Sequence, residues 1–354
     1  DLARTASASE TALSNRNIVT NGAMQVAQRS ASVTGIGASS GYFTLDRWNI
    51  STSSSAGRLT MTQTADGPSG FANCLKLDCT TADTSIAAAE FLLLQQRFEG
   101  QDLQQLKKGT SDAELITVSF YVKANAAFDF VLELQDSDNS RNIHKVFATT
   151  TGWVRHELTF PADTTGAFDD GNAASFQIVF WIHAGSTFTG GTLNTAAWAE
   201  NDNANRAAGI DSFYSSTDNN FFITGVQLEV GTVATPFEHR SYGQELALCQ
   251  RYYQKTYTIA SYAAANDPLG AVSFIPINAD DDININFISR MRAAPTVTTY
   301  RKNGGATGSS QISSNAGTYI AITVGSIADV GLNIQPASAD SRAYRFHYLA
   351  DAEL

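Results

Sequence analysis

Residues 221–255 read FFITGVQLEVGTVATPFEHRSYGQELALCQRYYQK, and this stretch joins three structural signals. Apolar and polar residues alternate over 221–230, with Phe222 and Val226 placed on the apolar face, which predicts a strand. Residues 231–240 follow as an irregular, proline-containing crossover. The strand and crossover together indicate the end of one domain.

A short helix is expected next, over residues 241–255. Ser241 is a suitable N-cap, and Gln244 three residues later completes a capping box. The helix would carry one apolar stripe at helical spacing, made of Tyr242, Leu246, Cys249 and Tyr253. Such a stripe needs a partner surface, which fits a helix that links two domains or packs in an oligomer.

The composition of the whole chain favours short strands and polar loops. Its 354 residues are enough for two domains, and only 16% of them are charged, against the usual quarter. The formal net charge of −11 argues against nucleic acid as a partner, because phosphate binding depends on clustered lysine and arginine. No apolar run approaches the roughly 18 residues of a membrane span, so membrane insertion is not expected. Three cysteines imply no disulfide framework.

Short strand signals separated by turns follow one another along most of the chain. Each is rich in β-branched and aromatic residues and alternates with a period of two. Only residues 101–108 resemble a helical turn. Regular short strands without intervening helices predict an all-β fold, an antiparallel jelly-roll sandwich. The clearest strands lie at residues 88–98, 115–124, 128–135, 153–160 and 175–183.

Six sequence blocks carry a resemblance to a known family. In order and spacing they resemble the carbohydrate-binding-module-like jelly roll of bacteriophage tail-fibre and related virion appendage proteins, over residues 15–254. The most specific block is the last one. The blocks are NRNIVTNGAMQVAQR (15–29), YFTLDRW (42–48), QQRFEGQDLQQLKKG with ITVSFYVKA (95–124), TTGWVRHELTF (150–160), FFITGVQLEVG (221–231) and ATPFEHRSYGQELALCQRYYQ (234–254).

The resemblance implies a domain organisation. Residues 1–14, built mostly of Ala, Ser and Thr, are an unstructured tail or the end of a stalk, which orders only against a partner. Residues 15–240 are the jelly roll, 241–255 the linking helix and 256–354 a smaller C-terminal β domain. That last part resembles the distal domains that trimerise in fibres, so a homotrimer is expected. A monomeric sandwich is the alternative.

No catalytic or metal motif stands out. Glycoside hydrolysis needs a pair of carboxylates in defined roles, and among 34 acidic residues unmotivated pairs are expected by chance. The five histidines lack metal-ligand spacing, and no G-x-S-x-G nucleophile motif is present. We therefore expect no enzyme. The carboxylates considered are Glu90, Glu133, Asp169, Asp211 and Glu229.

Sugar binding is better motivated by the strands. Aromatic faces stack on sugar C–H groups, and planar polar side chains satisfy hydroxyls. Strand alternation places one set of polar and aromatic residues outward on 115–124, 128–135 and 175–183. If these strands are neighbours, the set shares one glycan-binding surface. Its members are Tyr121, Lys123, Glu133, Gln135, Gln177, Trp181 and His183.

Each candidate has a structural alternative. The long loop 184–220 would bury Trp181 and Tyr121 if it folds over them. Separately, the alternative for Lys123 and Glu133 is a cross-strand surface ion pair and nothing more, worth less than ~1 kcal/mol. Trp153, which follows a glycine turn, is expected to be a core anchor rather than a sugar platform.

The resemblance also raises the question of calcium. In such sugar-binding jelly rolls, acidic residues follow the first Asn-Gly pair and occupy the last strand. This chain has NGAM at 21–24 and TGVQ at 224–227, so those carboxylates are missing. Backbone carbonyls with Asp46 are the remaining ligands, and we expect no cofactor or metal.

The sequence thus predicts a non-enzymatic virion protein, made in the host cytoplasm. It would be the outer part of a tail fibre that attaches to host surface polysaccharide, joined to other virion proteins through residues 1–14. Several copies would multiply weak individual contacts. One alternative is a capsid-decorating, head-fibre or other assembly protein with no sugar-binding role. Another is a polysaccharide depolymerase.

Overall fold

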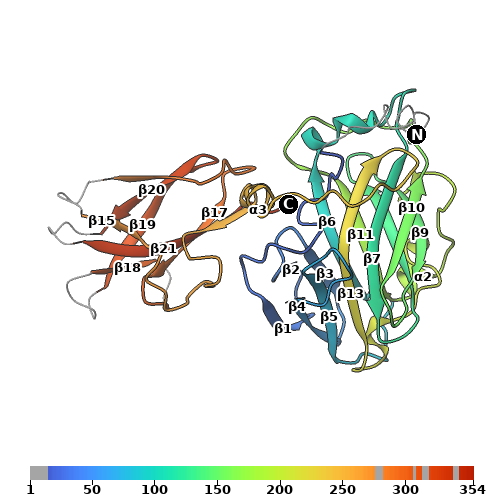
Figure 1. Ribbon diagram of the computed structural model, residues 1–354, viewed down its shortest axis with the longest axis horizontal. Helices are drawn as coiled ribbons and strands as arrows, with labels where there is room; N and C mark the ends of the chain where they lie inside the picture. Colours follow the sequence, from blue (N-terminus) through green and yellow to red (C-terminus); the bar gives the residue numbers. More distant parts are fainter. Residues whose placement is uncertain (1–14, 276–281, 306–307, 313–318, 338–342) are drawn as a thin grey trace. The chain divides into compact units, whose positions relative to one another are not determined.

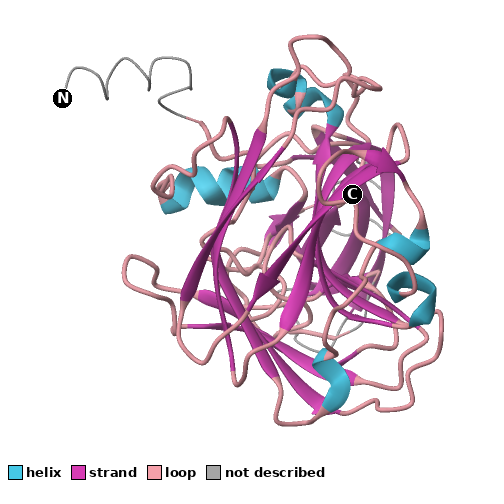
Figure 2. Cartoon of the chain, turned by 90° about the vertical axis from the view of Figure 1, so that its right-hand side faces the viewer, coloured by secondary structure: helices cyan, strands magenta, loops and turns pink. Residues whose placement is uncertain are grey.

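The computed structural model describes residues 15–275, 282–305, 308–312, 319–337 and 343–354. They form two compact units, one reaching to Gln25 and resuming over Ala31–Ser241, the other comprising Val26–Ser30 and Tyr242–Leu354. Strands and loops make up nearly all of the described residues, and the helices among them are short (Figure 2). The tail expected at residues 1–14 lies outside the described residues.

Two antiparallel sheets build the first unit (Figure 1). The first sheet has the order β1 (Ser32–Ile36), β4 (Arg58–Thr64), β5 (Cys74–Thr81), β13 (Asn220–Val230), β7 (Ile116–Ala124) and β10 (Val154–Phe160). The second sheet has the order β12 (Ala199–Glu200), β9 (Arg141–Ala148), β8 (Asp129–Asp136), β11 (Ala174–Ala184), β6 (Phe91–Glu99), β3 (Asn49–Ser53) and β2 (Gly41–Tyr42). The predicted antiparallel β-sandwich is confirmed.

Aromatic side chains fill the space between the two sheets. Phe120 of β7 lies with its ring centroid 5.2 Å from Phe147 of β9 and 5.1 Å from Phe180 of β11, both edge to face. Phe221 of β13 meets Phe130 of β8 in the same way at 5.8 Å. Such rings bury large apolar areas and add favourable edge-to-face electrostatics. The helical turn expected at 101–108 is present as two 3₁₀ turns, Gly100–Asp102 and Gln104–Leu106.

A β-bulge interrupts the alternation of β13. Thr224 pairs with Tyr121 but Gln227 pairs with Ser119, so β13 contains one more residue than β7 at this point. Gly225 adopts a φ of +63°, and a Cβ there would lie 2.7 Å from the Phe71 ring. The extra residue inverts the alternation along the strand.

The bulge changes which face of the sheet each residue occupies. Phe221 and Ile223 point into the core before it, and Val226 points into the core after it; all three are fully buried. Phe222 therefore lies on the outer face, where it is half-buried. The prediction that Phe222 and Val226 share an apolar face is wrong, because a uniform period of two cannot represent the inserted residue.

The N-terminal block of the unit packs against this bulge. The Val226 N–H donates to the Gly22 carbonyl at 3.0 Å, and the Asn17 side-chain amide donates to the Val226 carbonyl at 3.1 Å. The indole N–H of Trp48 donates to the Asn21 carbonyl at 3.1 Å. A Cβ on Gly22 would lie 2.1 Å from the Val226 carbonyl oxygen, so the close approach requires glycine.

The second unit is a smaller antiparallel assembly. Its main sheet has the order β14 (Tyr253–Lys255), β21 (Tyr344–Asp351), β18 (Ser309–Ile312), β19 (Tyr319–Ala328), β20 (Gly331–Pro336) and β16 (Ile283–Asn286). β15 (Val272–Phe274) and β17 (Thr296–Arg301) also pair with β21. Its apolar core includes Phe287, Met291, Ile334, Phe346 and Tyr348.

The linking helix is shorter than predicted. α3 spans Tyr242–Gln250, and Tyr253 begins β14, where it pairs with Asp351 of β21. The predicted apolar stripe therefore does not lie on one helix. Glu245 is buried on α3 while Tyr242 is 44% exposed. The backbone partners offered by β21 draw 253–255 into the sheet, and a local helical pattern does not register such long-range pairing.

Substitution of Gly225 tests the bulge. Gly225→Ala is expected to lower the free energy of unfolding of the first unit by about 3 kcal/mol, because the new Cβ is both strained at positive φ and in collision with Phe71. Gly209 is the matched control: its φ is +82° but a Cβ there meets open space, so Gly209→Ala loses only about 1 kcal/mol. Urea unfolding followed by tryptophan fluorescence reports this unit, since all four tryptophans belong to it. Equal losses for the two variants would contradict the steric explanation.

Candidate functional site

The structure divides the seven predicted site residues between different surfaces. Tyr121 and Lys123 lie on the outer face of the first sheet, because β7 pairs with β13 and β10. Glu133, Gln135, Gln177 and Trp181 lie on the outer face of the second sheet, where β8 and β11 are neighbours. His183 follows a register shift in β11 and pairs with Leu92, so it points away from that face. The alternation predicted for these strands is correct except at His183, and the single shared surface is wrong. A jelly roll sends strands that are consecutive in sequence to different sheets.

Segment 185–219 covers the second-sheet part of the prediction. Trp181 is only 1% exposed, and its ring lies 5.2 Å from that of Phe188 in this segment. The covering loop anticipated as an alternative is thus observed over Trp181. A small apolar cluster forms beneath it, made of Leu93, Val131, Val179, Trp181, Phe188 and Ala207.

Glu133 anchors the cover through a buried ion pair. Its carboxylate accepts hydrogen bonds from the Arg206 guanidinium at 2.9 and 3.0 Å and from the Trp181 indole at 2.6 Å. Burial alone would raise the pKa of Glu133, but the charge and hydrogen bonds of Arg206, together with the nearby His144 imidazole, hold that pKa down at about 2. Glu133 is fully buried, and its partner is Arg206 rather than Lys123.

The remaining second-sheet residues also have protein partners. His183 is fully buried with Nδ1 2.7 Å from Ser212 Oγ, and burial lowers the pKa of its imidazole. The Gln177 amide donates to Ser137 at 2.9 Å, and the Gln135 carbonyl accepts from Arg206 at 3.0 Å. These contacts hold the cover in place and leave no open sugar platform on this face.

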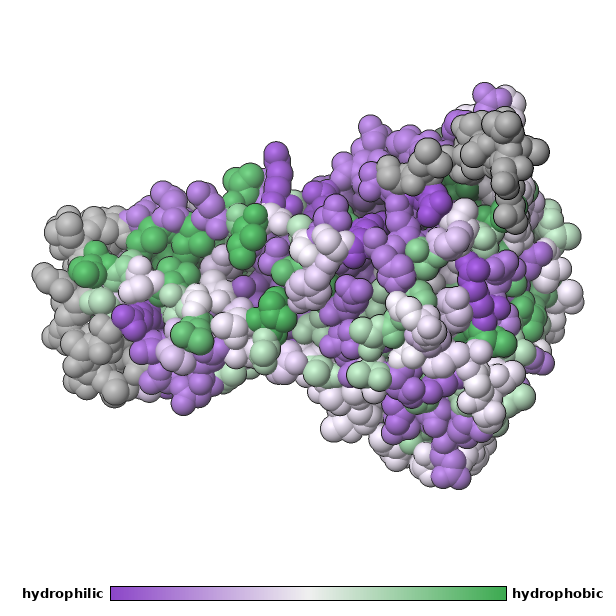
Figure 3. Space-filling model, viewed as in Figure 1, coloured by the Kyte–Doolittle hydropathy of each residue, from purple (hydrophilic) through white to green (hydrophobic). Residues whose placement is uncertain are grey.

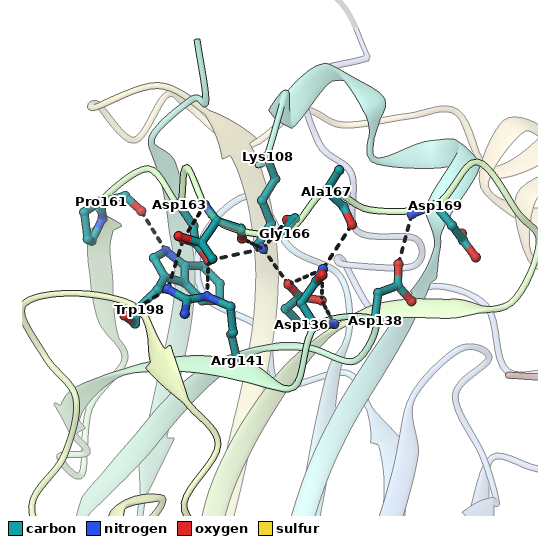
Figure 4. A network of polar contacts seen from close by, with 12 residues as sticks. Lys108, Asp136, Asp138, Arg141, Pro161, Asp163, Gly166, Ala167, Asp169 and Trp198 are labelled. Carbon is teal, nitrogen blue, oxygen red and sulfur yellow. Dashed lines mark hydrogen bonds and ion pairs between the residues drawn. The ribbon is translucent and has the colours of Figure 1, made fainter. Parts of the chain in front are cut away.

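A second buried ion network joins two loops of the same unit. The Lys108 ammonium lies 2.5 Å from Asp136 and 3.1 Å from Asp163, and it donates to the carbonyls of Thr165 and Gly166 (Figure 4). Its hydrogen-bonding capacity is used entirely within the protein. A cavity of about 380 Å³ adjoins it, lined in part by Leu103, Gln104, Lys107, Thr110, Asp112 and Phe168. We assign the network a structural role.

The outer face of the first sheet carries a different arrangement. Strand pairing joins Ser32 to Thr62, Thr62 to Lys76, Lys76 to Phe222, and Phe222 to Lys123. Trp153 precedes β10 and lies beside Lys123, since the next residues, Val154 and Val122, are paired. These side chains form one line across all six strands, the transverse row: Ser32, Thr62, Lys76, Phe222, Lys123 and Trp153.

Aromatic and cationic groups alternate along the row. The Lys123 ammonium lies 4.6 Å from the Phe222 ring centroid and 5.2 Å from that of Trp153. The Lys76 ammonium lies 5.6 Å from the same Phe222 ring centroid. All four side chains are half-buried. Trp153 is therefore not the core anchor that was predicted, because its position just before β10 directs it outward.

An aromatic group bounds the row along one side. The Phe71 ring lies 5.4 Å from Tyr121 and 5.0 Å from Phe237, and His239 joins them at 5.2 Å. Tyr121 thus contributes to this border rather than to an open platform. Beyond it, the crossover after β13 covers the remainder of the face, where the Glu229 carboxylate accepts from Thr235.

Each cation near the row has its own carboxylate. Lys123 lies 2.6 Å from Asp66, and Lys76 lies 3.1 Å from Asp78. Arg155, in the adjacent row, lies 2.5 Å from Glu157. Ammonium and carboxylate pairs offer both donors and acceptors to hydroxyl groups, while the aromatic faces accept C–H groups. The arrangement is chemically suited to holding a polyhydroxylated ligand.

Cys74 and His156, which lie near this face, are not placed for nucleophilic catalysis. Cys74 lies beneath loop 65–73, where burial raises the pKa of its thiol to about 11, far from the reactive thiolate range. His156 points inward and stacks on Phe120 at 5.4 Å, and burial lowers the pKa of its imidazole.

Among the described residues, no group of three or more His, Cys, Asp and Glu side chains is placed to hold a metal ion. The Asn21 amide already donates to the Asp46 carbonyl at 3.0 Å, and the residues near the Asn-Gly pair do not fit a calcium site. None of the helices in the described ranges has the length and apolar character of a membrane span.

Sequence reasoning missed five members of the row: Ser32, Thr62, Lys76, Phe222 and Trp153. Phe222 was assigned to the core because the bulge is not visible as a break in alternation. Alternation within each strand is consistent with Trp153 and Lys123 lying on the same face of the sheet. This could have been recognised only if the pairing of the two strands had been known. Only the glycine at 225 signals the bulge, since an isolated glycine within a strand often marks one.

No protein-family model matches the sequence, and no curated protein matches it. Solved structures show a distant similarity. A family 4 carbohydrate-binding module has a TM-score of 0.32 at 10% identity, over 60% of this chain and 99% of that chain. The enzymatically active domain of tailspike protein 4 from bacteriophage CBA120 has a TM-score of 0.32 at 11% identity, over 60% of this chain and 21% of that chain. A family 61 carbohydrate-binding module solved with β-1,4-galactotriose has a TM-score of 0.32 at 10% identity, over 61% and 100%.

Removal of the Glu133 charge tests the anchor of the cover. Glu133→Gln is expected to cost about 2–4 kcal/mol at neutral pH, because the Arg206 guanidinium loses its buried counter-ion. The folded-state pKa of Glu133 lies below its usual 4.5. Its stabilisation is therefore present above about pH 5 and is lost as the pH falls toward 2.

Acid unfolding monitored by tryptophan fluorescence measures both effects. The variant is expected to lose less stability than the native protein between these two pH values. Glu114→Gln is the control, because Glu114 pairs with Lys107 at the surface and its loss costs less than about 1 kcal/mol. Parallel pH profiles for native protein and Glu133→Gln would contradict the assignment.

Proposed function

We propose that this protein is a non-catalytic appendage protein of a virion that binds host surface carbohydrate through the transverse row. The observation that carries the proposal is the row itself, with half-buried Trp153 and Phe222 on either side of Lys123. It combines rings that stack on sugar C–H groups with charged groups that bond hydroxyls. The opposite outer face is covered around Trp181 by segment 185–219.

The non-catalytic part of the proposal rests on the carboxylates near the row. Asp66 and Asp78 are each held in an ion pair with a lysine. Glycoside hydrolysis needs one carboxyl as a proton donor and another as nucleophile or base. Neither aspartate is placed as a free donor. A depolymerase would release reducing ends from host polysaccharide, and we expect none.

The virion part of the proposal rests on the sequence blocks. The NRNIVTNGAM block at 15–24 supplies the Asn17 and Gly22 contacts that hold the bulge of β13. The YFTLDRW block supplies Trp48, which bonds Asn21. The residues that resemble tail-fibre proteins are thus the ones on which the sandwich depends. Attachment to other virion proteins is assigned to residues 1–14, as the sequence suggests.

The second unit is proposed to form a homotrimer. Most of the exposed large apolar side chains of the described residues belong to it, and apolar side chains are visible at its surface in Figure 3. Contacts between copies would remove this surface from water. These side chains are Tyr242, Leu248, Ile259, Leu269, Ile275, Ile288, Tyr319, Ile327 and Val330.

Loss of the row's aromatic rings tests the function. Trp153→Ala combined with Phe222→Ala is expected to weaken binding to immobilised bacterial surface polysaccharides at least about tenfold, since each lost stacking contact removes on the order of 1 kcal/mol. Binding is measured on a polysaccharide array and by adsorption of labelled protein to host cells.

Phe43→Ala is the matched control, because Phe43 is a half-buried aromatic residue of the first unit that follows β2 of the second sheet and lies outside the row. Its binding is expected to equal that of the native chain. Unchanged adsorption of the double variant would overturn the site. Location of the protein on the head rather than the tail would favour the decoration alternative.

The oligomeric state is tested by light scattering after size exclusion. We expect three times the chain mass. Ile288→Glu is expected to shift the mass toward one chain, because Ile288 is 71% exposed in the second unit and a charge there opposes burial. Val233→Glu, at a residue 69% exposed in the first unit, is expected to remain trimeric. A single-chain mass for the native protein would contradict the trimer.

A further inference from the structure

Building on the proposed function, we infer that the transverse row selects uncharged, hydroxyl-rich polysaccharide and disfavours polysaccharide that carries carboxylates. The inference comes from which charges on this face are available to a ligand. It concerns Lys76, Lys123 and the neighbouring Arg155, together with their carboxylate partners.

The cations of this face are the less accessible members of their pairs. The side chains of Lys123, Arg155 and Lys76 are 17%, 27% and 30% exposed. Their partners Asp66, Glu157 and Asp78 are 52%, 51% and 44% exposed. A chain laid on the row therefore meets carboxylate oxygens before it meets ammonium or guanidinium groups.

Lys123 is further withdrawn from ligands by its surroundings. Its ammonium lies between the Trp153 and Phe222 rings and 2.6 Å from Asp66. A ligand carboxylate would have to displace Asp66, and the displaced carboxylate would stay close by and repel it. The exchange replaces one ion pair by another and adds a like-charge repulsion, so it yields no net electrostatic gain.

Ligand hydroxyl groups, unlike ligand carboxylates, interact favourably with the carboxylates of this face. Exposed carboxylates accept hydrogen bonds from hydroxyls, and charge-assisted bonds of this kind are stronger than neutral ones. At the other end of the row, the Ser32 and Thr62 hydroxyls lie 3.0 Å apart and add further donors and acceptors. The net charge of −11 opposes polyanions at longer range as well.

The row is also long enough for several sugar residues. It crosses six strands, and neighbouring strands lie about 4.8 Å apart. Its two ends differ: hydroxyls at Ser32 and Thr62, an aromatic ring at Trp153. A linear chain lying across the strands would contact both ends, so oligosaccharides are expected to bind more tightly as they lengthen up to the span of the row.

The test compares polymers that share a backbone and differ in charge. Hydroxyethyl- and carboxymethyl-cellulose, dextran and carboxymethyl-dextran, and an array of neutral and acidic bacterial polysaccharides serve as probes, with the full-length protein and affinity electrophoresis as the measurement. Binding to neutral polymers is expected to change little with added NaCl. Binding to carboxylated polymers is expected to be weaker, and to strengthen as salt screens the repulsion.

A charge variant makes the inference sharper. Asp66→Asn combined with Asp78→Asn is expected to raise binding to the carboxylated polymers about three- to tenfold, because two repulsive charges are gone and two lysines are released. Glu114→Gln combined with Asp112→Asn, which also removes two carboxylates but at surface positions outside this face, is the control for net charge alone and is expected to raise it much less.

The outcomes separate this inference from the proposed function. Preference for acidic polymers that weakens with salt and is abolished by Trp153→Ala with Phe222→Ala would overturn the selectivity and leave sugar binding at the row intact. An equal gain from both charge variants would also overturn it. Absence of binding to every polymer would overturn both.

Discussion

The sandwich depends on the β-bulge at Gly225 and Val226 in its central strand. Only glycine fits at position 225, because the φ there is +63° and the Phe71 and Tyr121 rings would collide with a Cβ. The bulge turns the Val226 amide and carbonyl toward the N-terminal block, where Gly22 and Asn17 bond them. Buried backbone groups freed from the ladder must find such partners. Through this inserted residue, the N-terminal block is hydrogen-bonded to the central strand of the sheet.

The same bulge creates the candidate site. Without it, Phe222 would share the core face with Val226, and the row would have no ring between its two lysines. With it, Phe222 faces outward while Phe221 packs at 5.8 Å on Phe130 inside. The core therefore keeps its aromatic contacts while the outer face gains a platform. A substitution that removes the bulge is expected to affect stability and binding together.

The two outer faces of the sandwich illustrate opposite uses of similar residues. On the second sheet, Trp181 and Glu133 are sealed by Arg206 and Phe188, and burial makes their hydrogen bonds strong. On the first sheet, Trp153 and Lys123 stay half-buried beside Asp66, where an exposed ion pair contributes little to stability. In the proposed function, the groups that contribute little to folding are the ones that bind the ligand. Weak contacts of this kind become effective when several copies act together.

The sequence by itself determined the antiparallel β-sandwich, the position of its main strands to within a few residues, and the inward faces of β7, of β8 and of β11 as far as the register shift after Trp181. These follow from alternation, which is local and regular. It also indicated Lys123 as an outward residue. Only the tertiary structure decided that β7 and β8 belong to different sheets, that segment 185–219 covers Trp181, and that Phe222 and Trp153 face outward. Strand pairing, loop placement and bulges depend on hydrogen bonds between residues far apart in the chain, and a periodic pattern carries no information about them.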